Sequence, residues 1–173
     1  MLCKHVIVVS KNAEISWFGS GIQFSEIPEN KKLSKHFTIY NAIDVKRLNS
    51  IKNNVDVLKE KQKLKINKDR LIFGMVSRLS PEKGIDIALE AFKRVIKEKY
   101  DAHLLIVGGG NEEVTLKEMC KELKISKNVT FYGETNWADA MNQMALMDVV
   151  IVPSRFEGFG LSAAEAMAMG KPV

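Results

Sequence analysis

The sequence predicts an α/β fold, a Rossmann-like parallel sheet with helices on both faces. Two observations carry this prediction. From residue 71 onward, short apolar runs alternate four times with segments of helical periodicity. The runs are apolar at successive positions, which is typical of strands buried on both faces of a sheet. Right-handed crossovers make such strands parallel, and their helices then cover both faces.

The first 70 residues contain weaker signals. Residues 5–10 (HVIVVS) and 36–40 (HFTIY) are short apolar runs that predict strands. The polar, glycine-containing stretch between them has mixed helix signals and is assigned to no element. Residues 41–44 (NAID) predict a turn, because Asn and Asp side chains bond to nearby backbone. Residues 45–66 carry apolar side chains at broadly helical spacing, which predicts one helix.

After residue 70 the elements are clearer. The amphipathic segment 84–98, for example, places Ile85, Leu89 and Phe92 on one stripe. The expected strands are 71–77, 103–108, 128–133 and 148–153, and the expected helices are 84–98, 112–123, 137–146 and 161–169. Open parallel sheets bind ligands at the carboxyl ends of their strands. A site is therefore expected among the loops that follow the strands, which are 77–84, 108–113, 133–137 and 153–160.

Composition excludes several classes of protein. Of the 173 residues 46% are apolar and 27% charged, which is typical of a folded domain and not of a disordered or fibrous chain. No apolar run approaches the ~20 residues of a transmembrane helix. Cys3 and Cys120 are far apart and lack CxxC spacing, which indicates a reduced, cytoplasmic compartment. His5, His36 and His103 lack metal-ligand spacing, so no metal is expected.

The positive charge is concentrated in the first part of the chain. The net charge is +5, and the first 70 residues carry 14 Lys and Arg against 7 Asp and Glu. The densest run, 59–70, contains no aromatic side chain on which a base could stack, so nucleic acid is not expected. The run is interpreted as a solvated surface helix and loop. A weak peripheral attraction to acidic lipid stays open as an alternative.

The segment 153–173 contains a glycine loop followed by an apolar helix. Gly158 and Gly160 flank Phe159 just before the helix, where free backbone N–H groups favour phosphate. Glu165 lies within that helix and is either buried, facing a ligand's hydroxyls, or at one exposed edge. Glu157 either caps the helix or faces sugar hydroxyls. The two carboxylates also permit glycoside hydrolysis, but this alternative does not explain the glycine loop.

Two other loops contain residues that could bind phosphate, and the evidence for the two differs in strength. Arg78 offers a bidentate fork and Lys83 a point charge after the strand 71–77, although isolated surface cations are the commoner case. The loop 108–113 (GGGNEE) lacks the third glycine of a dinucleotide fingerprint and is interpreted as a tight turn. Met141, Met144 and Met147 recur at near-helical spacing and are interpreted as core residues.

Four segments, taken in order, carry a resemblance to a known family. They are MVSRLSPEKGID (75–86), HLLIVGGG (103–110), NVTFYGE (128–134) and VPSRFEGFGLSAAEAMAMGKPV (152–173). They resemble the C-terminal, nucleotide-sugar-binding half of a group 1 (family 4) retaining glycosyltransferase with the GT-B fold. VIVVSKN (6–12) and TIYNAID (38–44) more weakly resemble the end of its N-terminal domain and the interdomain linker, where Ala42 replaces a glycine.

The resemblance implies a division of the chain. Residues 1–40 would be the final strand–helix unit of an N-terminal acceptor domain, and 41–70 the interdomain linker with a basic helix. Residues 71–173 would be the donor-binding domain, so that the GT-B fold is incomplete at both ends. Family members are much longer, so the chain is expected to be a fragment or a truncated reading frame.

The resemblance also implies three catalytic residues. Arg78 and Lys83 would hold the pyrophosphate of a nucleotide-diphosphate sugar, and Glu157 would contact the donor sugar near the reacting centre. The family uses no metal and no separate cofactor, and the chain has no DxD motif. Its reaction retains anomeric configuration by front-face attack, so stabilising the departing diphosphate is the main task.

The remaining implied contacts bind the donor. Backbone amides from Gly158 through Phe159 and Gly160 to Leu161 would support its phosphate and sugar, and Glu165 would bind the ribose hydroxyls. A glycan or lipid-linked acceptor would bind through an N-terminal domain. Two alternatives stay open: a non-catalytic nucleotide-binding fragment, and a nucleotide-sugar epimerase or glycan phosphorylase of the same fold.

Overall fold

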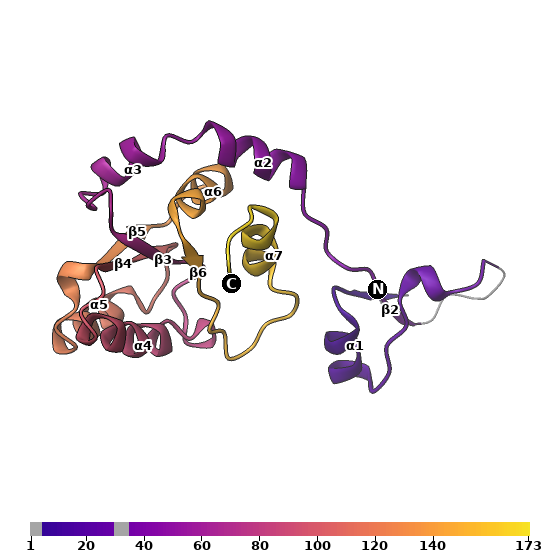
Figure 1. The fold of residues 1–173 in the computed structure, drawn as a ribbon. Helices are drawn as coiled ribbons and strands as arrows, with labels where there is room; N and C mark the ends of the chain where they lie inside the picture. Colours follow the sequence, from indigo (N-terminus) through magenta and orange to yellow (C-terminus); the bar gives the residue numbers. More distant parts are fainter. Residues whose placement is uncertain (1–4, 30–34) are drawn as a thin grey trace. The chain divides into compact units, whose positions relative to one another are not determined.

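The computed structural model describes residues 5–29 and 35–173, which form two compact units (Figure 1). The smaller unit contains the described residues up to Ile43 together with Glu157–Leu161. The larger unit contains Asp44–Phe156 and Ser162–Val173. Each unit is described by itself.

The larger unit is built on a four-stranded parallel sheet in the order β5-β4-β3-β6. Its strands are β3 (Leu71–Val76), β4 (Ala102–Val107), β5 (Val129–Gly133) and β6 (Val149–Val150). The central pair is in register along its whole length, from Leu71 beside Ala102 to Val76 beside Val107. The predicted parallel sheet is confirmed.

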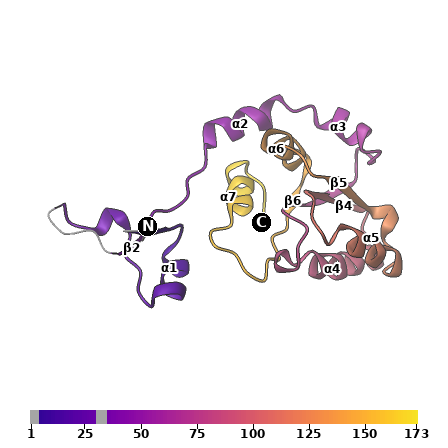
Figure 2. The same ribbon diagram turned by 180° about the vertical axis from the view of Figure 1, so that it is seen from behind.

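Helices cover both faces of this sheet, as predicted (Figures 1 and 2). α4 (Ile85–Lys97) and α5 (Glu113–Glu122) lie on one face. α6 (Trp137–Leu146) lies on the other, with α2 (Val45–Asn54) and α3 (Val57–Lys63) packed against it. The last helix, α7, spans Leu161–Ala168.

The core explains why the strands are apolar throughout. All six residues of β4 are buried, and Leu104, Leu89 and Phe92 belong to the hydrophobic cluster between the sheet and α4. On the opposite face, Gly74 leaves room for Met147, whose sulfur would lie 2.1 Å from a Cβ at that position. Met141, Met144 and Met147 are all buried, which confirms their interpretation as core residues.

Two expected elements differ in the structure. The single helix over 45–66 is wrong: it is interrupted at Val55, and Asp56 starts α3 by accepting a hydrogen bond from the Lys59 N–H at 3.0 Å. The strand over 148–153 is reduced to β6. Ile151 N–H still donates to the Gly74 carbonyl at 2.7 Å, but Pro153 has no N–H with which to continue the ladder.

The lysines of the basic run 59–70 lie on the surface, with one exception. Lys59, Lys63, Lys65 and Lys68 are exposed. Lys61 is only 8% exposed, and its ammonium donates to the carbonyls of Lys68 and Arg70 at 3.0 and 3.1 Å. Among residues 5–29 and 35–173, no helix is both long and apolar enough to span a membrane.

The described residues of the smaller unit include two short parallel strands and an α-helix that was not assigned from the sequence. The strands are β1 (Val6–Val8) and β2 (His36–Thr38), and the helix is α1 (Lys11–Phe18). Ser10 caps α1 by accepting from the Ala13 N–H at 3.2 Å. Glu14 is fully buried and accepts from the Thr38 hydroxyl at 2.5 Å, which fastens the helix to β2.

Candidate functional site

The larger unit has a pocket of about 230 Å³ at the carboxyl ends of β3, β4 and β5. This is the edge at which an open parallel sheet offers a binding site. Three of the loops in which a site was expected contribute to its walls. They are the loops 77–84, 108–113 and 133–137. The lining residues are Val76, Ser77, Arg78, Val107, Gly108, Gly109, Glu134, Thr135 and Ala140.

Arg78 and Lys83 lie on one loop, between β3 and α4. The Arg78 side chain is 80% exposed, and its Nη2 lies 3.6 Å from Oε1 of Glu82. At that exposure the ion pair contributes little stability, so the guanidinium is available to a ligand. Lys83 is half-buried and ends the short helix η2 (Pro81–Lys83).

The glycine loop 108–110 supports the loop that carries Arg78. Ser77 N–H donates to the Val107 carbonyl at 3.0 Å, and Leu79 N–H to the Gly109 carbonyl at 2.9 Å. A Cβ at Gly108, whose φ is +128°, would lie 2.0 Å from the Ser77 carbonyl oxygen. The glycines therefore serve close backbone packing, in agreement with the interpretation of a tight turn.

Arg155 joins the loop after β6 to the same β3–α4 loop. Its guanidinium forms a bidentate ion pair with Asp86, at 2.8 and 2.5 Å, and donates to the Pro81 carbonyl at 2.7 Å. The Arg155 backbone N–H donates to the Glu82 carbonyl at 2.8 Å. The Arg155 hydrogen bond holds the pKa of the Asp86 carboxyl below its usual value, so the pair stays charged. Neither Arg155 nor Asp86 was predicted from the sequence as a site residue.

Glu165 lies on α7 and is half-buried. Its exposure is thus intermediate between the buried position and the exposed helix edge that the sequence left open. Its Oε1 accepts a hydrogen bond from the indole N–H of Trp137 at 2.6 Å. Trp137 begins α6, directly after the loop that lines the pocket. No periodicity or motif in the sequence links these two residues, which are 28 positions apart.

The glycine loop 157–161 belongs to the smaller unit and is described with it. The Ser10 hydroxyl donates to the Gly158 carbonyl at 2.8 Å, and the rings of Tyr40 and Phe159 lie 6.4 Å apart. Gly160 is buried with a φ of +83°, a conformation that favours glycine. Glu157 is exposed, and Leu161 begins α7.

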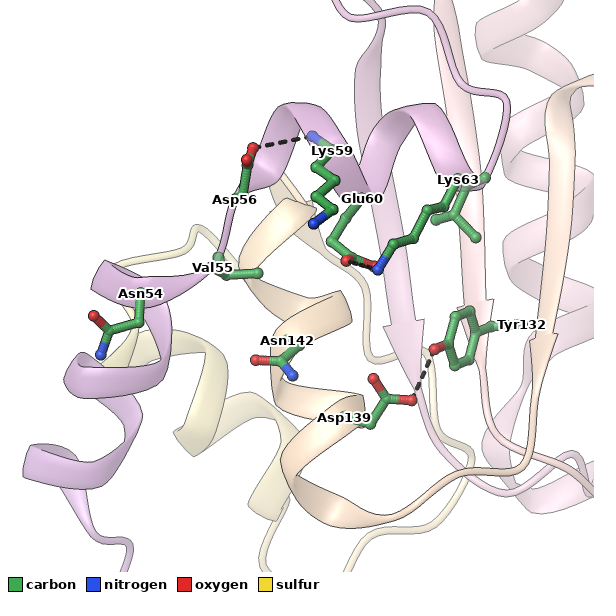
Figure 3. A pocket seen from close by; sticks show the side chains of 10 residues that line it. Asn54, Val55, Asp56, Lys59, Glu60, Lys63, Tyr132, Asp139 and Asn142 are labelled. Atoms are coloured by element: carbon green, nitrogen blue, oxygen red, sulfur yellow. Dashed lines mark hydrogen bonds and ion pairs between the residues drawn. The ribbon is translucent and has the colours of Figure 1, made fainter.

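A second, larger pocket of about 570 Å³ lies between α3 and α6 (Figure 3). Several of the polar side chains around it form hydrogen bonds or ion pairs with one another. The Tyr132 hydroxyl donates to Asp139 at 2.7 Å, and Glu60 pairs with Lys63 and lies 3.4 Å from the Gln143 amide. Burial, followed by the Asp139 carboxylate, raises the pKa of Tyr132 to about 12, so the phenol stays protonated as a donor. The Glu60–Gln143 contact links α3 to α6, and the Tyr132–Asp139 hydrogen bond links β5 to α6.

Two buried titratable residues of the larger unit, His103 and Cys120, lie outside these two pockets. Burial lowers the pKa of His103 to about 4, and its Nε2 bonds to the Thr130 hydroxyl at 2.8 Å. Burial raises the pKa of the Cys120 thiol to about 11. Cys3 lies outside the described residues. Within the described part of the chain, no three His, Cys, Asp or Glu side chains are grouped as metal ligands would be.

Comparison with known proteins gives the family. The model of the glycosyl transferases group 1 matches residues 56–173. A GDP-mannose-dependent monoacylated alpha-(1-6)-phosphatidylinositol monomannoside mannosyltransferase from Corynebacterium glutamicum is 33% identical over 91% of the chain and 39% of its own length. The D-inositol 3-phosphate glycosyltransferase of Segniliparus rotundus is 30% identical over 80% of the chain and 33% of its own length.

A solved structure agrees with this result. The crystal structure of Anabaena Alr3699/HepE in complex with UDP and glucose superposes with a TM-score of 0.76, at 26% identity, over 98% of this chain and 43% of that one. The fold is that of the GT-B glycosyltransferases, and the chain belongs to the group 1 glycosyltransferase family. It spans less than half the length of each of these three proteins.

Proposed function

We propose that this chain is the donor-binding part of a retaining glycosyltransferase that uses a nucleotide-diphosphate sugar. The observation that carries the proposal is the pocket at the carboxyl ends of β3, β4 and β5, with Arg78 on its wall and Lys83 on the same loop. At about 230 Å³ it is smaller than the ~300–1,000 Å³ typical of drug-sized ligands. In this proposal the pocket therefore binds only part of the nucleotide.

In this proposal the two cations act on the diphosphate. Negative charge grows on the leaving group as the glycosidic bond to phosphate breaks, so fixed positive charge stabilises the transition state more than the ground state. Arg78 can bind two phosphate oxygens with its fork, and Lys83 adds a compact charge. Glu157 would contact the donor sugar, the amides of Gly158–Leu161 its phosphates, and Glu165 the ribose.

Calorimetric titration of the chain with UDP, GDP and ADP tests donor binding. We expect one of them to bind at one site, and Lys83→Ala to weaken it about 10–100-fold, as loss of a charge-assisted hydrogen bond implies. Lys93→Ala is the matched control, because Lys93 is an exposed lysine of the adjoining helix α4. Binding that is absent for all three nucleotides, or unchanged in Lys83→Ala, would contradict the assignment.

We further propose that transfer itself needs more than this chain. A retaining transfer to a glycan or lipid-linked acceptor requires a site that positions the acceptor and excludes water. The chain spans 39% of the Corynebacterium glutamicum relative and 33% of the Segniliparus rotundus one. Incubation with UDP-glucose, GDP-mannose and ADP-glucose should therefore release no free nucleotide at a rate above background. Rapid release would contradict this.

A further inference from the structure

The carboxylate of Glu165 is held by a neighbour that no motif of the chain identifies. Its Oε1 accepts a hydrogen bond from the indole N–H of Trp137 at 2.6 Å, and the charge of the carboxylate strengthens this bond. Among the described residues, no hydrogen bond reaches the other oxygen, Oε2. Because the indole nitrogen can only donate, it fixes one carboxylate oxygen and leaves the other as an acceptor.

The indole itself is fixed from a second direction. The Arg47 guanidinium lies over the Trp137 ring, with its Cζ 4.4 Å from the ring centroid, at a distance suited to a cation–π interaction. Arg47 belongs to α2, Trp137 starts α6 and Glu165 lies on α7, so three helices of the larger unit meet at this ring. Trp137 is 37% exposed, so a ligand can reach the Trp137–Glu165 pair.

We propose that Trp137 is a positioning residue that sets the selectivity of this site for ribonucleotides. It holds Glu165 so that Oε2 accepts a hydrogen bond from a ribose hydroxyl, and the inference rests on the role proposed above for Glu165. A carboxylate that is already oriented loses less conformational freedom when the ligand binds. A site built to bond a hydroxyl also rejects an analogue that lacks it, because the polar group is then left without its partner.

The test compares a nucleotide with its hydroxyl-free analogue. The chain is titrated with whichever of UDP, GDP and ADP binds tightest, and with the 2′,3′-dideoxy form of the same nucleotide. We expect the wild-type chain to favour the ribonucleotide about tenfold or more, the loss that one charge-assisted hydrogen bond implies. Glu165→Gln should bring this ratio close to one.

Trp137→Phe keeps a ring for Arg47 but removes the N–H donor. We expect it to reduce the ratio severalfold while binding of the dideoxy form stays within twofold of wild type. Trp17→Phe is the matched control, because Trp17 is 76% exposed on α1 and should leave the ratio unchanged. An equal loss for both ligands in Trp137→Phe would assign Trp137 a merely structural role and overturn the proposal.

The outcomes separate the two proposals. If Glu165→Gln abolishes the ratio and Trp137→Phe does not change it, Glu165 keeps its role and the inference about Trp137 is wrong. If the wild-type chain binds both forms equally, the role of Glu165 fails and the inference fails with it. A second measurement does not depend on how Trp137→Phe folds. The chain has two tryptophans, so in Trp17→Phe the single indole N–H resonance should shift with the ribonucleotide and much less with the dideoxy form.

Discussion

At the scale of single residues, Gly84 determines how closely two loops approach beside the proposed phosphate site. Its φ is +65°, and a Cβ there would lie 2.2 Å from the Pro153 carbonyl oxygen. We expect Gly84→Ala to lower the free energy of unfolding by about 2–4 kcal/mol, from left-handed strain and the contact together. Gly133→Ala, at a φ of +93° with open space around it, should cost only about 1–2 kcal/mol in the same urea unfolding measurement. Equal losses would mean that the contact does not matter.

The buried imidazole of His103 makes stability depend on pH. Burial, and secondarily the charge of Arg70, lowers its pKa to about 4 from an ordinary value of 6.5. Above pH 6.5 the ring is neutral in both the folded and the unfolded chain. Below it the unfolded chain binds the proton first, so stability is lost as the pH falls from 6.5 towards 4.

We therefore expect this group to lower the free energy of unfolding by about 2 kcal/mol between pH 7 and pH 5. His103→Gln should remove that part of the pH dependence, whatever its effect on stability at pH 7. Denaturant unfolding of both proteins at the two pH values measures the difference. A pH dependence that is unchanged in His103→Gln would show that the ring is protonated without loss in the folded chain.

At the scale of elements, the Arg155–Asp86 ion pair joins the loop after β6 to the first turn of α4. Both side chains are near half-exposed, at 46% and 44%, so solvent screening reduces the value of the pair. Its bidentate geometry nevertheless favours a coupling energy, in a double-mutant cycle of Arg155→Leu and Asp86→Ala, that exceeds the coupling energy of a single-contact surface pair. The single-contact pair Lys117–Glu113 on α5 is the comparison, with about 0.3–0.5 kcal/mol expected. A coupling energy no larger than that of the Lys117–Glu113 pair would contradict the view that the Arg155–Asp86 pair holds its two segments together.

The elements that the sequence predicted best are those buried on both faces. The bounds of β3, β4 and β5 agree with those of the expected strands to within about a residue at each end. The reason is that a strand buried on both faces is apolar at successive positions, so the apolar run has the same length as the strand. α1 was left unassigned, since its only buried side chain is the charged Glu14 and no apolar stripe marks its face. The break between α2 and α3 was missed because the apolar spacing continues through Val55, whereas the capping bond of Asp56 determines where α3 begins.

The candidate site was predictable only as far as local sequence determines it. The loop that carries Arg78 and Lys83 follows directly from its place after a strand, and the structure puts it beside a pocket. The Trp137–Glu165 and Arg155–Asp86 contacts depend on how helices and loops distant in sequence pack together. Neither spacing nor residue type reveals such pairs in one sequence, so tertiary packing supplies this part of the site.

At the scale of the whole molecule, the two units differ in how their sheets are protected from water. β4 is central, and all six of its residues are buried. β1 and β2 form a two-stranded parallel sheet, and Val6 and Ile7 are 41% and 59% exposed. Two strands alone are marginally stable in water, and parallel sheets are ordinarily covered on both faces. We therefore expect the sheet of the smaller unit to open at a much lower free energy than the sheet of the larger one.

Hydrogen exchange followed by mass spectrometry measures this difference within one sample. Amides of β4 should exchange only through global unfolding, whereas amides of β1 and β2 should exchange through local opening, orders of magnitude faster. Adding denaturant should speed exchange in β4 strongly and in β1 and β2 only weakly, because local opening exposes little new surface. The internal comparison is β3, which should follow β4, its partner along six registered pairs. Equal protection and equal denaturant dependence in β2 and β4 would show instead that the two units unfold as a single cooperative body.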